Sequence, residues 1–399
     1  MPIRVLQVLP GLVPPPKDPT YAEVYHLPGD ISGDILLPTW AKTAEQLRDK
    51  VGSFPTYRVN NFTYHMHLAK YQYGTLRQKL DVFRFFMRTG LRLGRQQRYD
   101  LVKCYGIGLT GLTAVVLARL LRAKLIVQLP NAPEDMYRYS KFGDAYEYSA
   151  KPDIRTRIVR TIYQVVLRVV VLSADHMQLL YPRQLRAFPR LQRVPATVLP
   201  SFVPVSRVPQ SGDEDGSVLL VGAPWYLKGV DVLIRAWRMI EADFPNNKLR
   251  LLGYFPELDM LSAMIGDSRQ IEILKARTHP ETLQIIARCS ILVLASRTEG
   301  VPRVFIEAMA AGKPIVGSRV GGVSHYIHNG VNGFVFESEN ADELAEQLKV
   351  LLEWPELRAR MGENGRRFVR TQLYESTYAR RVQEMFELTV HGRPAQPNL

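Results

Sequence analysis

Residues 296–333 read SRTEGVPRVFIEAMAAGKPIVGSRVGGVSHYIHNGVNG, and they follow a short apolar run, ILVLAS. That run is typical of a buried parallel strand, because it is brief, apolar and bounded by polar residues. Pro302 suits the first position of a helix, where a missing N–H costs nothing, and Gly312 suits the C-cap. The pattern therefore predicts a strand, then a loop that carries Glu299, then a helix that carries Glu307.

The start of this helix favours an anionic or oxygen-rich ligand. The N–H groups of Arg303, Val304 and Phe305 should point toward whatever lies above the loop, where the helix dipole adds positive charge. A structural alternative is that Glu299 caps the helix and Glu307 pairs with Arg303. Arg before Glu is the weaker order for such a pair, which is worth about 0.2–0.5 kcal/mol. Taken alone, the two carboxylates favour the structural alternative.

The wider pattern changes that balance. Glu-Gly-x-Pro-x-x-x-x-Glu-Ala-Met-Ala-x-Gly-Lys-Pro-Ile-Val, followed by Gly-Gly and Asn-Gly-Val-Asn-Gly, resembles the donor-site signature of family-four retaining glycosyltransferases, the glycosyl transferases group 1. The resemblance implies an α/β fold of GT-B architecture, with two Rossmann-like doubly wound domains and an interdomain cleft. The matching residues are Glu299, Gly300, Pro302, Glu307, Ala308, Met309, Ala310, Gly312, Lys313, Pro314, Gly321, Gly322, Asn329, Gly330, Asn332 and Gly333.

The resemblance also implies a retaining hexosyltransferase that uses a nucleotide-sugar donor and needs no metal or other cofactor. Glu307 is expected to bind the ribose hydroxyls. Glu299 is expected to hold the hexose hydroxyls and to favour positive charge at the anomeric carbon. Lys228 should stabilise the leaving diphosphate, which is the charge effect that usually dominates such catalysis. No base is identifiable, and in this family the leaving phosphate is thought to serve.

The expected site residues gather at strand ends, where doubly wound sheets bind their ligands. Glu299 and Lys228 are the catalytic candidates. The donor-binding candidates are Gly11, Gly222, Lys228, Gly300, Val301, Pro302, Arg303, Val304 and Glu307, and no metal ligands are expected. The chain departs from the family pattern where Ala223 replaces an arginine and His325 replaces a glutamate. The family's histidine in the N-terminal domain is also missing, since 129–131 read Leu-Pro-Asn.

A length of 399 residues predicts two or three domains. From residue 217 strands and helices alternate regularly, which implies a parallel doubly wound sheet. We expect an N-terminal Rossmann-like acceptor domain over 1–205, a linker over 206–216, a C-terminal Rossmann-like nucleotide-sugar domain over 217–370, and a terminal helix over 371–390 that crosses back to the N-terminal domain. Asp213 and Asp215 form a D-x-D pair in the linker, where a solvated turn is expected rather than a metal site.

The net charge of +14 is carried by the first half of the chain. Residues 1–210 hold 30 Lys and Arg against 14 Asp and Glu, whereas residues 211–399 hold 22 against 24. This asymmetry bears on partners rather than on fold. A glycan or lipid-linked acceptor, as in polysaccharide or glycolipid biosynthesis, and an anionic membrane surface are the expected partners, and nucleic acid is not.

A helix is expected over 75–96, with two stripes on its surface. The apolar stripe expected to face the core consists of Leu76, Leu80, Phe83, Met87 and Leu91, and Val82, Phe86 and Leu93 widen it on one side. The basic stripe, about 100° around the helix, consists of Arg77, Arg84, Arg88, Arg92 and Arg95. It is either a solvated flank or a face that meets an anionic surface.

The first apolar run is too short for a signal peptide, and no stretch reaches 18 uncharged apolar residues. Cys104 and Cys289 are expected to be buried thiols in a reducing compartment. The expected location is therefore cytoplasmic, on the inner face of the membrane as a peripheral protein. The donor is expected to be a UDP- or GDP-linked sugar.

Three other functions compete with this interpretation. One is a GT-B protein that binds a nucleotide sugar but transfers it poorly. Another is an NAD-dependent oxidoreductase that uses GIGLTG, the fingerprint formed by Gly106, Gly108 and Gly111. The next strand ends in Gln128 with no acidic residue to hold a ribose, so close helix–strand packing is the preferred explanation. A basic nucleic-acid-binding protein is disfavoured, because no binding motif accompanies the charge.

Overall fold

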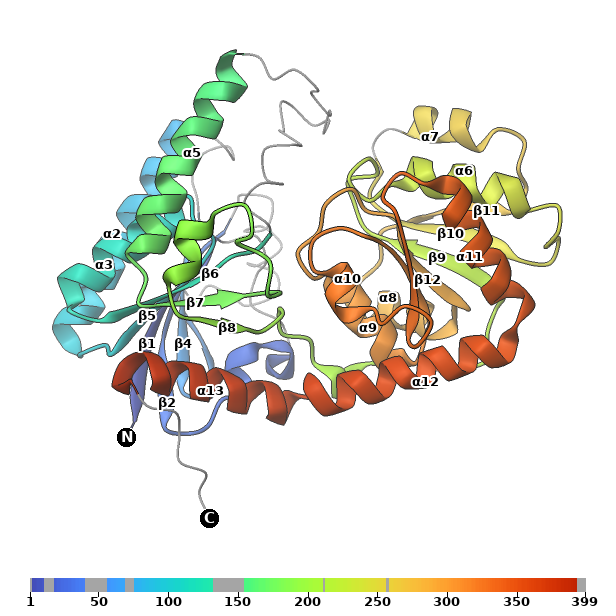
Figure 1. The fold of residues 1–399 in the computed structure, drawn as a ribbon. Helices are drawn as coiled ribbons and strands as arrows, with labels where there is room; N and C mark the ends of the chain where they lie inside the picture. Colours follow the sequence, from blue (N-terminus) through green and yellow to red (C-terminus); the bar gives the residue numbers. More distant parts are fainter. Residues whose placement is uncertain are drawn as a thin grey trace. The chain divides into compact units, whose positions relative to one another are not determined.

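The computed structural model describes residues 2–10, 18–39, 56–68, 75–131, 154–210, 212–255 and 258–392 (Figure 1). Gly11, one of the expected donor-binding residues, lies outside these ranges. The chain divides into two compact units. The first contains residues up to 133, residues 152–202 and residues from 376 onward, and the second contains residues 203–375.

The first unit is built on an eight-stranded sheet with the order β3–β4–β2–β1–β5–β6–β7–β8. All neighbouring pairs are parallel except β3 and β4. The strands are β1 (Ile3–Val8), β2 (Ile31–Thr39), β3 (Thr56–Val59), β4 (Phe62–Leu68), β5 (Leu101–Tyr105), β6 (Lys124–Gln128), β7 (His176–Leu179) and β8 (Ala196–Val198). Strands are added on one side of β1 and then on the other, which is the doubly wound arrangement.

Helices cover both faces of this sheet, as a parallel sheet requires. The helices α2 (Leu76–Gln96), α3 (Leu109–Leu121) and α5 (Ile154–Leu172) pack on one face. The helix α13 (Glu375–His391) covers the other face, where Val382 and Phe386 join the core beneath β1 and β2. The short turns η1 (Pro19–Tyr21) and η2 (Glu23–Tyr25) lie on the same face as α13.

The expected core face of α2 is only partly right, because Met87 and Leu91 of the expected stripe pack against the core but are only half-buried. Leu76 and Leu80 are exposed, and the face buried against the sheet and α3 instead carries Val82, Phe86 and Leu93. Both stripes are apolar, so periodicity alone does not choose between them. Close packing determines which side of α2 is buried, because leucine side chains of α3 contact Gly90 and Gly94 of α2. The basic stripe of α2 is exposed along its whole length.

The second unit contains a six-stranded, fully parallel sheet with the order β11–β10–β9–β12–β13–β14. Its strands are β9 (Ser217–Val221), β10 (Lys248–Gly253), β11 (Ile271–Lys275), β12 (Ile291–Leu294), β13 (Ile315–Ser318) and β14 (Gly333–Phe336). Counted from β9 the order is 3-2-1-4-5-6, which is the usual Rossmann order. The direction of winding therefore reverses between β9 and β12.

Seven helices of the second unit fall within the described residues. They are α6 (Val230–Ile240), α7 (Leu258–Ile265), α8 (His279–Arg288), α9 (Arg303–Ala311), α10 (Val323–Tyr326), α11 (Ala341–Glu353) and α12 (Pro355–Gln372). A core around Trp237, Val293 and Leu348 joins α6 and α11 to the sheet. The helix α9 packs against α8 and α12. Two Rossmann-like doubly wound sheets thus confirm the predicted fold class.

Two smaller observations complete the fold. Both cysteines are free and buried, as predicted, and burial raises the pKa of each thiol to about 12. In the part of the chain that the structure describes, no helix has both the length and the apolar composition needed to cross a membrane.

Candidate functional site

The topology of the second unit brings two of the predicted site residues together. Ligands of doubly wound sheets bind outside the carboxyl ends of the strands, at the point where the strand order reverses. That point lies between β9 and β12. Lys228 lies in the turn that follows β9, and Glu299 lies in the loop that follows β12. Their meeting therefore follows from the strand order as well as from the sequence motif.

Lys228 and Glu299 form a direct ion pair. The Lys228 ammonium donates a hydrogen bond to Oε1 of Glu299, and the Ser296 hydroxyl donates to the same oxygen at 2.9 Å. The Lys228 side chain is 21% exposed and that of Glu299 is 10% exposed. Gly222 directly follows β9, and the Lys228 stem passes over it, 3.0 Å from where a Cβ would lie. Because an ammonium has three donors, Lys228 has further donors for a ligand oxygen.

A buried arginine clamps the two loops that carry this pair. Arg297 binds Asp231 through two parallel hydrogen bonds of 2.8 and 2.7 Å, and it binds Glu339 at 2.6 and 2.9 Å. Its guanidinium also donates to the Tyr226 carbonyl at 2.5 Å and lies 3.9 Å from the centre of the Tyr226 ring. The backbone N–H of Arg297 donates to Leu227 at 2.9 Å. The loop after β12 is thus fixed to the turn that presents Lys228.

The electrostatics of Arg297 follow from these contacts. Burial alone would lower the pKa of the guanidinium, but the hydrogen bonds that it donates to the Asp231 and Glu339 carboxylates outweigh burial and raise that pKa above its usual value. Arg297 is therefore a permanent cation whose charge is neutralised by two carboxylates. It does not supply the cation that the family pattern places at Ala223. Arg297 does not stand out in the sequence, because its partners lie 66 and 42 residues away.

Two glycines allow the loops to approach this closely. Gly229 has φ +64°, and a Cβ there would lie 1.9 Å from the Ala295 carbonyl oxygen. Gly321 has φ +48°, and a Cβ there would lie 1.7 Å from the Glu299 carbonyl oxygen. Both positions exclude any other residue, through backbone strain and through direct overlap. The first glycine of the Gly-Gly pair thus packs directly against the backbone of the Glu299 loop.

The start of α9 differs slightly from the expectation. Pro302 is the N-cap and the helix begins at Arg303, one residue later than predicted, while Gly312 is the predicted C-cap with φ +77°. The Phe305 N–H donates to the Pro302 carbonyl at 3.1 Å, so it does not point into the site as expected. The N–H groups of Arg303 and Val304 are the ones that lack partners within the helix.

The other residues of this loop differ in exposure. Gly300 and Val301 are buried, Val304 is half-buried, and the Arg303 side chain is exposed. Gly300 accepts a hydrogen bond from the Gly322 N–H at 2.8 Å, so the second half of the Gly-Gly pair also holds the loop. Gly300 and Val301 therefore shape the backbone, and Arg303 presents a charge to solvent.

Glu307 is buried and has a partner that the sequence does not reveal. The Nε2 atom of His279, the first residue of α8, lies 2.8 Å from Oε1 of Glu307. The structural alternative paired Glu307 with Arg303, but no ion pair joins these two residues in the described part of the chain. A capping box formed by Thr278 and Glu281 begins α8 and fixes the position of His279. That S/T-x-x-E signal was readable in the sequence, but its proximity to Glu307 was not.

Two further sequence features have structural roles. Asp215 is not part of a solvated turn as expected: its carboxylate accepts hydrogen bonds from Ser217 and pairs with Arg250. Gly111 of the GIGLTG stretch packs tightly, because a Cβ would lie 2.9 Å from the Gly106 carbonyl oxygen. That contact confirms close helix–strand packing. Among the described residues, no group of three or more His, Cys, Asp and Glu is arranged to hold a metal ion.

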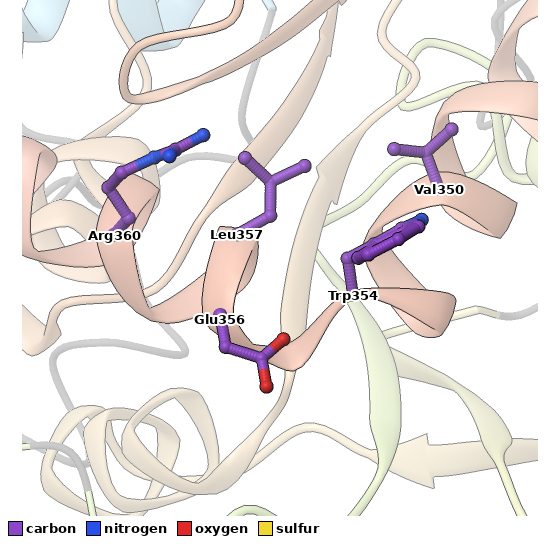
Figure 2. A pocket seen from close by; sticks show the side chains of 5 residues that line it. All are labelled: Val350, Trp354, Glu356, Leu357 and Arg360. Atoms are coloured by element: carbon purple, nitrogen blue, oxygen red, sulfur yellow. The ribbon is translucent and has the colours of Figure 1, made fainter.

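A surface hollow in the second unit is separate from this site. It has a volume of about 300 Å³. Figure 2 shows the side chains that line it on α11 and α12 and between them, which are Val350, Trp354, Glu356, Leu357 and Arg360. None of these residues comes from the loops that carry Lys228 and Glu299. The hollow therefore takes no part in the arrangement described above.

Comparison with known proteins identifies the class of fold. Residues 206–368 match the sequence model of the family described as "Glycosyl transferases group 1". The two sheets match solved structures over nearly the whole chain, and the fold is the GT-B fold of glycosyltransferases. Sucrose-phosphate synthase from Thermosynechococcus elongatus superposes with a TM-score of 0.76 at 15% identity, covering 98% of this chain and 100% of that chain. Anabaena HepE in complex with UDP-glucose gives 0.68 at 17% identity, covering 96% and 98%.

Curated relatives match part of the chain. An uncharacterized glycosyltransferase from Methanocaldococcus jannaschii is 35% identical over 152 residues, which is 38% of this chain and 42% of that protein. N-acetyl-alpha-D-glucosaminyl L-malate synthase from Bacillus anthracis is 28% identical over 162 residues, covering 40% and 41%. The chain thus spans less than half of the length of these relatives.

Proposed function

We propose that this chain is a glycosyltransferase that moves a sugar from a nucleotide-sugar donor to an acceptor. The observation that carries the proposal is the Lys228–Glu299 pair at the point where the sheet of the second unit reverses its strand order. A cation and a carboxylate at that point suit a donor with an anionic diphosphate and a hydroxyl-rich sugar. The match of residues 206–368 to a glycosyltransferase family supports the same assignment.

Each site residue has a separate role in this proposal. Lys228 leaves part of its contact with Glu299 and donates to the diphosphate, which it stabilises as the bond to the sugar breaks. Glu299 binds sugar hydroxyls and favours positive charge at the anomeric carbon. Glu307 accepts from the ribose hydroxyls, while His279 holds one of its oxygens and so orients the carboxylate. The N–H groups of Arg303 and Val304 add donors for the phosphates.

We propose Arg303 for a second phosphate contact. A diphosphate carries about two charges, and the loss of one charge-assisted bond weakens binding by about 1.5–3 kcal/mol. Ala223 supplies no cation, and Arg297 is occupied by Asp231 and Glu339. Arg303 is exposed at the first turn of α9 and is the cation we assign to this contact.

We further propose that the reaction retains the anomeric configuration, with the leaving phosphate as base and without a metal. The donor is proposed to be a UDP- or GDP-linked hexose. The structural neighbour HepE is in complex with UDP-glucose, and that ligand belongs to HepE. The acceptor is proposed to be a glycan or lipid-linked intermediate bound by the first unit. The enzyme is proposed to act in the cytoplasm at the inner face of a membrane, in polysaccharide or glycolipid biosynthesis.

A second candidate is a GT-B protein that binds a nucleotide sugar but transfers it poorly. Ala223 and His325, which depart from the family pattern, favour this candidate. Product formation with a panel of donors and acceptors separates the two functions. A binder would show donor affinity without turnover in any combination.

Titration calorimetry with uridine and guanosine diphosphates tests the assigned roles. Glu307→Ala should weaken nucleoside diphosphate binding, whereas Glu299→Ala should spare that affinity and reduce turnover. Equal losses of affinity in both variants would contradict the separate roles. Lys228→Ala should weaken binding of the diphosphate far more than of the nucleoside, because only the diphosphate presents anionic oxygens.

The metal-free proposal has its own test. Turnover should persist in EDTA, because the D-x-D pair lies in the linker, where Asp215 pairs with Arg250. Complete loss of activity in EDTA, restored by manganese, would overturn it.

A further inference from the structure

The helix α5 has an apolar stripe that faces away from its own unit. Ile158, Ile162, Val165, Val169 and Leu172 are all between 46% and 62% exposed. They follow one another at spacings of four, three, four and three residues, so they lie on one line along the helix. The buried contacts of α5 come from a different side, which carries Leu167, Val170 and Val171.

Residues 157–162 near the start of α5 are exposed on every side of the helix. Each residue from 157 to 162 is exposed, and Ile158, Val159 and Ile162 among them are aliphatic. With a rise of about 1.5 Å per residue, the stripe from Ile158 to Leu172 is about 21 Å long. A straight apolar line of this length on a monomer surface is a feature of interaction sites.

The layer of helices that carries the stripe is strongly basic. The helices α2, α3 and α5 contain eleven Lys and Arg but one acidic residue, Asp81, which lies 2.8 Å from His67. Among the side chains of α5 that the structure describes, Arg157, Arg160 and Arg168 are exposed, and the sequence of this helix contains no Asp or Glu. The layer therefore offers apolar contact and positive charge together, which is the composition of helices that lie in a membrane interface.

The same layer contains a basic hollow at one end. The three helices connect parallel strands in the same direction, so their last turns share one end of the layer. A hollow of about 390 Å³ lies there between the ends of α2 and α3, and its lining includes Arg95, Arg98 and Arg122. Arginine side chains in such a hollow suit a phosphate group.

The positive charge around the apolar stripe of α5 favours an anionic lipid surface over a second copy of this chain as the partner. Regular spacing of four and three also suits packing against a second helix. A second copy of this chain would bring arginine against arginine, with no carboxylate on α5 to pair with them. An anionic lipid surface offers an apolar layer and negative charge in one plane.

We propose that α5 inserts its outward stripe into the interface of an anionic lipid bilayer, while the arginines of α2, α3 and α5 bind lipid phosphates. This inference deepens the proposed membrane association and rests on it. It names α5 as the inserting element, whereas the sequence pointed to the arginine stripe of α2. The proposal does not depend on the transfer reaction.

Sedimentation of the full chain with lipid vesicles tests it. The protein should bind vesicles that contain phosphatidylglycerol, ignore phosphatidylcholine alone, and bind less well as salt is raised. The double variant Ile162→Ser, Val165→Ser should bind about tenfold or more weakly, because it removes apolar side chains that enter the interface. The triple variant Arg84→Ser, Arg88→Ser, Arg92→Ser should lose up to about fivefold for each arginine.

A matched control removes two equally exposed apolar residues from the second unit. Met239 and Met260 are 54% and 48% exposed, and the variant Met239→Ser, Met260→Ser should bind vesicles like the unmodified protein. A direct probe of insertion is Ile162→Trp, whose fluorescence should be quenched by brominated lipid. Binding of uridine diphosphate measured on each variant shows whether the second unit remains intact, so failure of membrane binding is distinguishable from failure of the proposed donor site.

Several results would overturn the proposal. One is an absence of binding to anionic vesicles at low salt, and another is a stripe variant that binds as tightly as the unmodified protein. Lack of quenching at Trp introduced at position 162 would refute insertion. A dimer in solution that the stripe variant dissociates would assign the stripe to a second copy instead.

Discussion

Replacement of Arg297 by methionine should destabilise the second unit more than any surface charge change. The variant keeps most of the side-chain volume but removes every hydrogen bond to Asp231, Glu339 and the Tyr226 carbonyl. Removing one partner of a buried ion pair costs about 3–5 kcal/mol, because the other charge is left without compensation. The Arg297 side chain is 4% exposed, but that of Glu339 is 51% exposed, so we expect the lower end, about 3 kcal/mol.

Urea unfolding followed by tryptophan fluorescence measures this loss. Three of the four tryptophans, at positions 225, 237 and 354, lie in the second unit, so the signal reports mainly on it. The matched control is Arg319→Met, which removes an ion pair to Glu337 whose side chains are 53% and 63% exposed. That control should cost less than about 1 kcal/mol.

The clamp should also matter for the ligand. Because Arg297 holds the turn that presents Lys228, Arg297→Met should weaken uridine diphosphate binding at temperatures where the variant is still folded. Arg297→Lys should recover little, since lysine cannot reproduce the two-pronged contact with Asp231. If Arg297→Met loses no more stability than Arg319→Met, the clamp described here is not what holds the two loops together.

Three other outcomes are expected. Gly321→Ala should lower the free energy of unfolding by well above about 1–2 kcal/mol, the cost of a left-handed backbone alone, since its Cβ would meet the Glu299 carbonyl oxygen. Gly330→Ala, with φ +77° and open space around it, should cost only that backbone strain, and chemical denaturation compares the two variants. Burial would raise the pKa of Asp215, but hydrogen bonds from Ser217 and Arg250 lower that pKa overall. The ionised Asp215 therefore stabilises the fold above about pH 4, and this stabilisation is lost as the pH falls further. In Asp215→Asn the free energy of unfolding should depend less on pH in that window. His279→Ala should weaken uridine diphosphate binding about tenfold, with partial recovery in His279→Asn, and calorimetry that shows no change would separate His279 from the nucleotide site.

Much of the second unit was predictable because its strands are short, apolar and regularly spaced. The run that became β12, the glycine that ends α9 and the loop that carries Glu299 all follow from local pattern and turn chemistry. Together with βα alternation they imply a parallel sheet, and a parallel Rossmann sheet places its ligand at the strand ends. The proximity of Lys228 and Glu299 is therefore a consequence of fold class.

The partners of the buried charged residues were not predictable in the same way. Arg297 lies in a motif of the sequence, but nothing local indicates that Asp231 and Glu339 surround it. His279 meets Glu307 across two helices, and that contact depends on how α8 packs against α9. Such pairings are set by tertiary packing, whereas spacing reports only on contacts within one element.

The faces of the helices in the first unit were also ambiguous. α2 has apolar residues on two sides, and the stripe with the better period, from Leu76 to Leu91, is only partly buried, whereas Val82, Phe86 and Leu93 are fully buried. In α5 a regular apolar stripe is exposed, although periodicity of this kind usually marks a core face. Periodicity shows that a helix has an apolar face, but the neighbouring elements decide which face is covered.

Release of nucleoside diphosphate from UDP-, GDP- and ADP-sugars tests the central claim most directly. The unmodified protein should hydrolyse or transfer from at least one donor, and Lys228→Ala and Glu299→Gln should each abolish most of that release while the fold remains intact by circular dichroism. If no donor is turned over and none of the three nucleoside diphosphates binds, the assignment of Lys228 and Glu299 to a nucleotide-sugar site is contradicted.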